Sequence, residues 1–226
     1  FWGYKTAGLF QNQKEINDWI AAGNGIYQAD VKPGDVKYVD VNHDGVINAS
    51  DKVDLGNGLP KYTFGFNFNL AWRGFDLSAN FTGAAGFQIA QSYRNPDSSQ
   101  ANYSRRILKR WTGEGTSNEI PRVTYGDVGN WLFSDLYLQD GDYIRLQNLT
   151  MGYDFKKLIS WKGLSKMRLY FQVQNLFTLT KYDGMDPEIG SFNGTDGNSS
   201  DSWVSGVDMG YYPHPRTFIV GLNLAF

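Results

Sequence analysis

Residues 61–72 alternate strictly between apolar side chains and polar or small ones. This alternation has the period of two that is typical of a β-strand whose two faces meet different environments. It predicts a long strand with one wholly apolar, largely aromatic face. That face consists of Tyr62, Phe64, Phe66, Phe68, Leu70 and Trp72, and the opposite face of Lys61, Thr63, Gly65, Asn67, Asn69 and Ala71.

Four further segments show the same alternation. We expect a tight turn at Arg73-Gly74, followed by strands over 75–87, from about 142 to 155, from 167 onward, and over 218–226. Within the third segment, Ile144 and Leu146 lie on the opposite parity from Met151. We therefore expect a β-bulge there, or an upper strand end that packs against loops.

The length of these strands and the spacing between them favour a membrane β-barrel over a soluble β-sandwich, which is the alternative fold. Strands of soluble sheets usually have about 5–6 residues, whereas a tilted transmembrane strand needs about 9–11. Short connections at 73–74 and 156–165 alternate with long ones at 88–141 and 181–215, a pattern typical of outer-membrane barrels. The expected fold class is therefore an all-β, transmembrane antiparallel barrel with long extracellular loops.

Five strands are too few to close a barrel, because the smallest barrels have about eight. An open sheet in lipid would leave unpaired backbone groups at both edges. We therefore expect a C-terminal piece of a larger barrel, completed by upstream residues or by another chain. If the short turns are periplasmic, the C-terminus lies at the periplasmic face. The expected division is an extracellular loop segment over 1–60 and barrel strands with their loops over 61–226.

Composition excludes several other classes of protein. Aromatic residues make up 16% of the chain, which excludes disorder, and no stretch approaches the roughly 20 apolar residues of a membrane-spanning helix. Lysine and arginine number 21 against 23 acidic residues, so nothing indicates nucleic-acid binding. The sequence contains no cysteine, which excludes disulfides, thiolate metal sites and cysteine nucleophiles.

The segment before the first long strand contains an expected short helix over 12–22. Asn12 can cap its start, Glu15 stands where it would complete a capping box, and Gly23 can end it. Ile16, Trp19 and Ile20 form one apolar stripe, which we expect to pack on outer loops.

Residues 40–51 fit the pattern D-x-N-x-D-G-x-I-x-x-x-D of a calcium loop. Calcium takes six to eight oxygen ligands, supplied from fixed loop positions. Gly45 permits the sharp turn, and Ile47 would bury the centre of the loop. The alternative is a turn rich in Asp and Asn that binds no metal. The candidate metal ligands are Asp40, Asn42, Asp44, the Val46 carbonyl, Asn48 and Asp51, and because position 12 is Asp rather than Glu, Mg²⁺ is an alternative to a structural Ca²⁺.

Several strings, in order along essentially the whole chain, resemble the C-terminal part of the SusC/RagA family of TonB-dependent outer-membrane transporters. The resemblance is carried by GYKTAGLFQ at 3–11, KPGDVKYVD at 32–40, GNGLPKYTFG at 56–65, LQDGDYIRL at 138–146, LTMGY at 149–153, VQNLFTLTKY at 173–182 and YYPHPRTF at 211–218.

The resemblance implies a barrel of about 22 strands with a plugged lumen, in the outer membrane of a Gram-negative bacterium. It also implies a SusD-like surface lipoprotein as a lid, and import of oligosaccharides or peptides driven by the TonB complex. The TonB box and plug lie near the N-terminus of family members, outside this chain. The terminal Phe226 resembles the signal that is read by the barrel-assembly machinery. A passive or structural barrel, such as a porin or an adhesin anchor, is the alternative function.

No catalytic constellation or cofactor-binding motif can be assembled, so no enzyme activity is expected. The only histidines are His43, inside the Asp/Asn loop, and His214, between two prolines, where we expect it to pack in a loop. Asp183, Asp186 and Glu188 could be imagined as a glycosidase-like set, but a solvated loop with turns is the better account.

Other loop residues are left without a substrate role. A basic cluster at 105–111 is expected to be a solvated helical turn, with contact to lipopolysaccharide or the lid as the alternative. The tract 190–202 is expected to be a mobile loop tip. Outer-loop aromatics could stack on sugars or pack on the lid, and these are Trp131, Tyr137, Phe192, Trp203, Tyr211 and Tyr212.

Overall fold

The computed structural model describes residues 1–92, 105–124, 129–159, 161–189 and 206–226. The chain forms two compact units. Unit 1 comprises 1–58, 90–139 and 207–209, and unit 2 comprises 59–89, 140–206 and 210–226. The first boundary thus lies close to the expected division at residue 60, and residues 90–139 group with the N-terminal segment. The division into domains 1–60 and 61–226 stays a prediction, because contact units need not be independently folding domains.

Unit 1 is built from short elements around a small apolar core. Strand β1 (Trp2–Tyr4) pairs with β4 (Lys52–Asp54), and β2 (Thr6–Leu9) pairs with β3 (Val36–Tyr38), both antiparallel. Short 3₁₀ turns occupy Ala49–Asp51, Arg105–Lys109, Gly129–Trp131 and Asp135–Tyr137. The core consists of Tyr4, Leu9, Val36, Tyr38 and Ile47, against which Trp111, Leu132 and Leu136 pack.

The expected short helix is α1 (Gln13–Ala21). Asn12 caps it by accepting the backbone N–H of Glu15, and Gly23 follows its end with a positive φ of 82°. The capping box is wrong in one detail, because the Glu15 carboxylate accepts the backbone N–H of Gln11 at 2.6 Å. This hydrogen bond satisfies the backbone N–H of Gln11, the residue before the N-cap. The second Glu15 oxygen forms an ion pair with Lys37 Nζ at 2.5 Å. Only Ile16 of the apolar stripe is fully buried.

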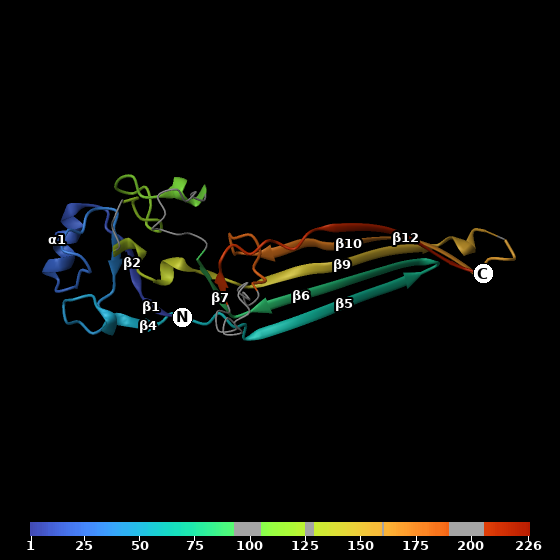
Figure 1. Ribbon diagram of the computed structural model, residues 1–226, viewed down its shortest axis with the longest axis horizontal. Coiled ribbons are helices and arrows are strands. Elements are labelled where there is room, and N and C mark those ends of the chain that lie inside the picture. The colour runs from blue at the N-terminus through green and yellow to red at the C-terminus, as the bar shows by residue number, and fades with distance from the viewer. Residues whose placement is uncertain (93–104, 125–128, 160, 190–205) are drawn as a thin grey trace, which may run out of the picture. The chain divides into compact units, whose positions relative to one another are not determined.

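Unit 2 contains a five-stranded antiparallel sheet of long strands in the order β12-β10-β9-β6-β5 (Figure 1). The five expected strands are confirmed. Their bounds are Tyr62–Trp72 for β5, Phe75–Ala85 for β6, Tyr143–Asp154 for β9, Lys166–Thr180 for β10 and Thr217–Ala225 for β12. The expected turn between β5 and β6 is also confirmed, with Arg73 and Gly74 both at positive φ. Among the described residues the sheet is open, so β5 and β12 each have one neighbour.

The expected bulge lies at Gln147. Pairing between β6 and β9 runs from Asn80↔Asn148 directly to Phe81↔Leu146, which leaves Gln147 as the extra residue. A bulge changes the parity of all residues beyond it. Ile144 and Leu146 therefore join the same face as Met151, and the apolar face of β9 is continuous despite the change of phase in the sequence.

A second apolar cluster in unit 2 lies near the ends of β6 and β9. It consists of Ala84, Phe87, Ile89 and Tyr182, with Tyr143 and Ile189 packed against it. The short strands β7 (Gln88–Gln91), β8 (Leu138–Asp140) and β11 (Val207–Asp208) form a three-stranded sheet in the order β11-β7-β8. The chain passes between the two units within β7 and β8.

Among the described residues, none of the helices has both the length and the apolar character needed to cross a membrane.

Candidate functional site

One face of the five-stranded sheet is apolar and exposed to its surroundings. Strand pairing aligns the apolar positions of neighbouring strands, so Phe66 faces Phe81 and Phe171 stacks on Phe218. The side chains of Tyr62, Phe66 and Phe218 are 69%, 59% and 62% exposed. A soluble protein rarely leaves a contiguous apolar patch of this extent uncovered. The face therefore requires an apolar environment beyond the described residues.

The opposite face of the same sheet is polar. Rows of small polar side chains cross the strands in register, one through Asn69, Ser78, Thr150 and Gln172, and the next through Asn67, Asn80, Asn148 and Gln174. Gln172 donates from Nε2 to Asn148 Oδ1 at 3.4 Å. Such a face is compatible with water or polar ligands and incompatible with lipid.

An ion pair crosses this polar face near the β5–β6 turn. The Arg168 guanidinium on β10 reaches over β9 to Asp76 on β6, with Nε–Oδ1 at 2.8 Å and Nη2–Oδ2 at 2.5 Å. Gly152 is the residue of β9 that lies beneath the pair, and a Cβ there would meet both side chains. The glycine thus makes room for an interaction between strands that are not neighbours.

At the other end of the sheet, a group of four charged or titratable side chains gathers on the polar face. We call Arg145, Asp186, Glu188 and His214 the Arg145 group. Arg145 lies on β9 between Thr82 and Thr178 of the flanking strands, and its Nε donates to Thr178 Oγ1 at 2.9 Å. Because the bulge at Gln147 fixes the parity of this stretch, Arg145 points away from the apolar face.

Arg145 is buried and forms ion pairs with two carboxylates of the segment after β10. Its Nη2 donates to Asp186 Oδ1, and its Nη1 donates to Glu188 Oε2 at 2.9 Å. Asp186 is also buried, whereas Glu188 is about half exposed. A buried charge needs such partners, since an unpaired one would cost several kcal/mol. The pairs therefore hold the segment 182–189 against the sheet.

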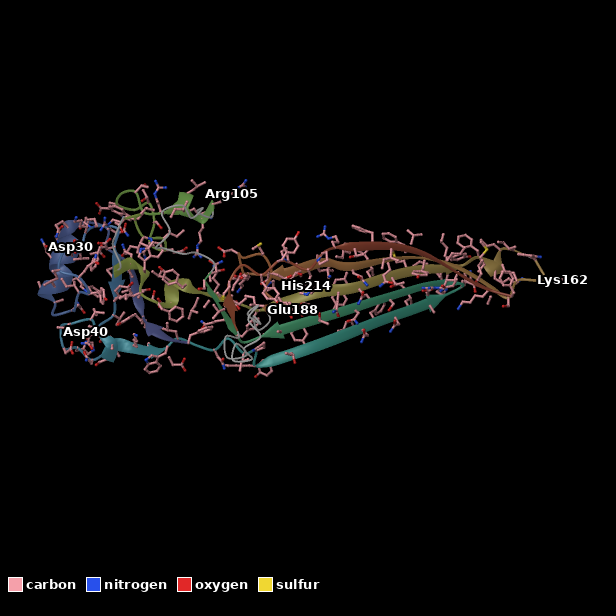
Figure 2. The ribbon with its side chains drawn as sticks, in the orientation of Figure 1. Asp30, Asp40, Arg105, Lys162, Glu188 and His214 are labelled. Carbon is pink, nitrogen blue, oxygen red and sulfur yellow. The ribbon has the colours of Figure 1, made fainter. Side chains whose placement is uncertain are left out.

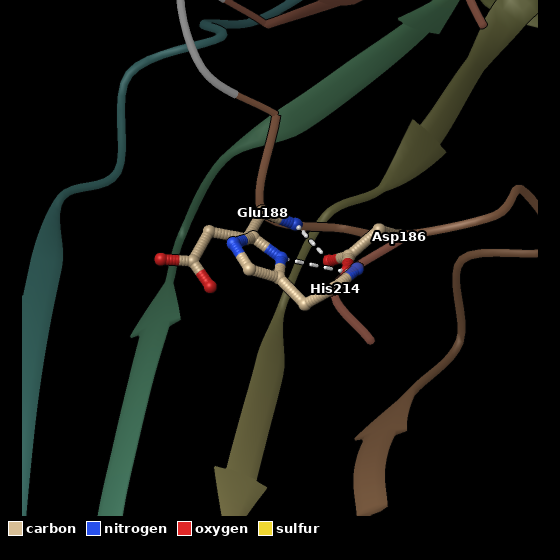
Figure 3. A group of neighbouring side chains, drawn as sticks. All are labelled: Asp186, Glu188 and His214. Atoms are coloured by element: carbon tan, nitrogen blue, oxygen red, sulfur yellow. Dashed lines mark hydrogen bonds and ion pairs between the residues drawn. The ribbon is translucent and has the colours of Figure 1, made fainter. Parts of the chain in front are cut away.

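His214 connects a third segment to the group. Its backbone N–H and its ring Nδ1 each lie 3.1 Å from Asp186 Oδ2. Figure 3 shows the His214 ring and the Glu188 backbone N–H meeting the Asp186 carboxylate, while the Glu188 carboxylate extends away from it. Burial by itself raises the pKa of Asp186, but the N–H donors of Glu188 and His214, the His214 ring and the Arg145 charge outweigh it, so the pKa is lowered. Asp186 is therefore ionised at neutral pH.

The spacing of this group could accommodate a metal ion, but its charges are satisfied without one. Ligand atoms of Asp186, Glu188 and His214 lie within 4.8 Å of one another. However, the Arg145 guanidinium occupies one oxygen of each carboxylate, and its positive charge opposes a cation at the same place. The arrangement is best described as an ion-pair group that joins β9 to two loop segments.

The Asp/Asn loop of unit 1 is closed by its own backbone donors. Asp40 accepts the backbone N–H groups of Asp44 and Gly45 at 3.3 and 2.7 Å, and Asp51 accepts those of Val41 and Asn48 at 2.9 and 2.8 Å. Asp40 and Asp51 are buried, and Ile47 packs in the unit 1 core as expected.

The remaining predicted ligands line the exposed side of the loop. Asn42 and Asp44 are bonded to each other at 2.9 Å, and the Asn48 amide reaches the Val46 carbonyl at 3.3 Å. Burial raises the pKa of Asp40, yet the surrounding backbone N–H groups lower it further than burial raises it. The donor set is thus anionic, rich in oxygen and compatible with a hard cation. Metal binding by this loop stays a prediction.

The basic cluster is a 3₁₀ turn over Arg105–Lys109, as expected for a solvated helical turn. Trp111 departs from this interpretation, because it packs in the unit 1 core and donates from Nε1 to Gln11 Oε1 at 3.2 Å. Tyr212 is 83% exposed. The tract 190–202, which includes Phe192, and Trp203 lie outside the described residues.

The sequence suggests Asp186 and Glu188 only as part of a glycosidase-like set with Asp183, gives His214 a separate role in loop packing, and does not single out Arg145. Their positions in the sequence give no local signal, because three separate segments supply them. Arg145 lies in the segment 138–146 and His214 in the segment 211–218, and the structure connects both to Asp186.

Comparison with known proteins shows which proteins the chain resembles. No protein-family model matches it. It is 32% identical over its whole length to TonB-dependent receptor P3 of Formosa agariphila, and 27% identical over 89% of its length to TonB-dependent receptor SusC of Bacteroides thetaiotaomicron. The chain is thus similar in sequence to TonB-dependent receptors, SusC among them. It spans 22% of the length of receptor P3 and 18% of that of SusC.

Solved structures share the fold of the chain. The solved structure of the RagAB peptide transporter matches the whole chain with a TM-score of 0.68 at 21% identity, and the chain covers 23% of the matched chain. A RagAB peptide importer in its open-open state matches with a TM-score of 0.66 at 20% identity. The fold is thus that of a stretch of such a transporter. The relatives are receptors and transporters rather than enzymes, in agreement with the expectation of no enzyme activity.

Proposed function

We propose that this SusC-like chain contributes strands and outer loops to a TonB-dependent importer in the outer membrane of a Gram-negative bacterium. The observation that carries the proposal is the two-faced sheet of unit 2. Its apolar face suits lipid, and aromatic residues at its margins such as Tyr62 and Trp72 suit the membrane interfaces. Its polar face suits the interior of a barrel closed by further strands, since open edges are too costly in lipid.

The cargo in this proposal is an oligosaccharide or a peptide, taken up with a SusD-like lipoprotein as lid and with energy from the TonB complex. The names of the similar proteins support this role, because they are TonB-dependent receptors, SusC and a RagAB peptide importer. A strain that lacks the full-length protein should lose growth on one class of oligosaccharide or peptide. Growth that is unchanged on every glycan and peptide tested would contradict the proposal.

A passive barrel is the competing function, and energy dependence separates the two. If the protein is an importer, uptake of its cargo stops when TonB is deleted, although the protein remains in the outer membrane. A passive pore would keep its flux in the same strain. Co-purification of a lipoprotein lid from mild detergent tests the partner, and its absence under conditions that retain cargo binding would remove that part of the proposal.

The proposed orientation places the β9–β10 turn and the C-terminus at the periplasmic face. Lys162 lies in that turn, at the end of the strands opposite to Glu188 and His214 (Figure 2). This stretch contains no cysteine of its own, so a single cysteine placed in it can report topology once any cysteines elsewhere in the full-length protein are replaced. A membrane-impermeant maleimide should label Met185→Cys on intact cells and Lys162→Cys only after permeabilisation. The reverse pattern would invert the orientation.

For the loop 40–51 we propose a structural Ca²⁺ site, with Mg²⁺ as the alternative ion. The support is its sequence pattern together with the buried, ionised Asp40 and the buried Asp51. In this proposal the ion ties the loop to the unit 1 core through Ile47 and takes no part in import. Thermal stability with and without added calcium tests it.

A further inference from the structure

One end of the long sheet is both aromatic and basic. We call the β5–β6 turn at 72–74 and the described part of 154–165, between β9 and β10, the basic rim. The backbone N–H of Asp154 donates to the Gly74 carbonyl at 2.8 Å, so the two segments lie side by side. Trp72 and Trp161 are 64% and 60% exposed. Because tryptophan favours the boundary between hydrocarbon and water, the basic rim suits the headgroup level of a membrane.

The charge of the basic rim is unbalanced. Its sequence contains four basic residues, which are Arg73, Lys156, Lys157 and Lys162, and one acidic residue, Asp154. A carboxylate at Phe226, whose ring meets Trp161, would still leave a positive excess. Asp154 Oδ1 accepts two backbone N–H groups at 3.0 and 3.3 Å. Within the described part of the chain, the side chains of Arg73 and Lys162 are exposed and have no ion-pair partner.

The other ends of the same four strands are balanced in charge. Lys61 precedes β5 and Lys181 follows β10, while Asp140 and Asp142 precede β9. Lys181 Nζ lies 3.8 Å from Asp140 Oδ2. Both ends of the sheet meet water in the proposed importer, so solubility alone would not concentrate cations at one of them. The asymmetry points to an anionic partner at the basic rim.

The two exposed cations of the basic rim each adjoin a tryptophan. Arg73 occupies the tight turn at a φ of 48°, and its guanidinium carbon lies over the Trp72 ring, 5.2 Å from the ring centre. A guanidinium stacked on a ring is held in position, and its planar set of N–H donors matches the oxygens of a phosphate. In the second segment, Lys156 Nζ donates to the carbonyl of Trp161, the residue before Lys162, at 2.7 Å.

We propose that the basic rim binds the headgroup phosphate of an anionic phospholipid, with Arg73 and Lys162 as the cations that contact it. The inference rests on the proposed function, because it needs the apolar face to lie in lipid. A phospholipid is the partner because its acyl chains would cover the adjoining apolar face while its phosphate meets the cations. Its net charge is negative, since the cation of a zwitterionic headgroup offsets the attraction. Lys162 marks this end of the strands in Figure 2, which is the periplasmic end in the proposed orientation.

The test compares lipid binding by variants of the full-length protein, purified in mild detergent. The probes are phosphatidylglycerol and zwitterionic phosphatidylcholine with the same acyl chains, and native mass spectrometry measures how much of each is retained. Arg73→Gln and Lys162→Gln, singly and together, remove charge from the basic rim, and Arg73→Lys keeps it. Lys166→Gln is the matched control, because Lys166 is exposed at the same end of β10 but has the parity of Arg168 on the polar face.

We expect the wild type to prefer phosphatidylglycerol about 25-fold, each single glutamine variant to keep a preference of about fivefold, and the double variant to keep none. Arg73→Lys and Lys166→Gln should retain the preference of the wild type. Equal binding of both lipids by the wild type, or an unchanged preference in the double variant, would overturn the proposal. So would an equal loss in Lys166→Gln, or displacement of the lipid by inorganic phosphate at the same concentration.

Failure of the proposed function gives a different result. If the purified protein prefers phosphatidylglycerol but a deletion strain takes up every glycan and peptide as well as the parent strain, the import role fails and the lipid site stands. If uptake is lost on deletion but the purified protein binds both lipids equally, the lipid site alone fails. Heat-dependent gel mobility confirms that each variant is folded before its lipid binding is compared.

Discussion

An arginine in the middle of the apolar face should lower the folding stability far more than an arginine at the adjacent position. The reason is that neighbouring residues of a strand point to opposite faces of the sheet. Phe68 and Asn67 provide the pair. Strand β5 spans Tyr62–Trp72, so Asn67 is its central residue and Phe68 lies one residue beyond it. At a rise of about 3.4 Å per residue and a tilt of about 40°, Phe68 lies about 3 Å from mid-depth.

The expected magnitudes follow from this depth. An arginine on the lipid face near the midplane costs about 2–4 kcal/mol, which is about a 30- to 700-fold change in the folding equilibrium. Phe68→Ala serves as the reference, so that loss of the ring is not counted as cost of the charge. Asn67→Arg enters the polar face, where Asn67 pairs with Asn80, and should change stability by about 0.5 kcal/mol or less.

Refolding of the full-length protein into lipid vesicles at increasing denaturant measures both effects. The proportion of heat-resistant, fast-migrating protein reports the folded state at each concentration. Equal costs for Phe68→Arg and Asn67→Arg, or a larger cost for Asn67→Arg, would refute the assignment of the apolar face to lipid.

Three further predictions concern the charged sites. Asp44→Ala should abolish the rise in melting temperature that calcium gives the wild type, and an equal rise in both proteins would remove the metal proposal. Arg145→Met leaves Asp186 buried without its ion-pair partner and should destabilise the packing of 182–189 by about 3–5 kcal/mol, measured as faster amide hydrogen exchange in that segment; exchange that is unchanged would contradict the packing role. Because the pKa of Asp186 is lowered in the folded state, its stabilisation is present above the pKa of the unfolded carboxyl and is lost as pH falls through the lower folded value. Asp186→Asn should therefore flatten the loss of stability as the pH falls below about 4, and the same pH dependence in both proteins would refute this assignment.

The strands could be predicted from the sequence because each carries its own signal. Tyr62 to Trp72 alternate without a break, and the Arg73-Gly74 pair marks the turn. The bulge was expected from the change of parity in the third strand, but its location at Gln147 depends on pairing with β6 and could not be read from one strand. Glu15 shows a similar limit, since the sequence places its carboxylate beside the N-cap but does not show that it accepts the backbone N–H of Gln11.

The Arg145 group could not be predicted for a different reason. Its members come from a strand and from two loop segments, and no periodicity or spacing links positions 145, 186 and 214. Each residue has an ordinary local explanation when it is taken alone. Only the arrangement of the segments in space shows that Arg145 is buried and that His214 is held by Asp186.

Because both edges of the sheet are open, part of its stability must come from strands outside this stretch. Within the described residues, β5 and β12 each lack a neighbour on one side, and every residue of β5 is exposed. Their backbone groups contribute fully to stability only when other strands pair with them. Substitutions along these two strands should therefore show thermodynamic coupling to residues outside this stretch. Among related proteins, the residues of β5 and β12 should therefore change together with residues of strands outside this sheet. The residues of β9 should change together with those of β6 and β10, which flank it here.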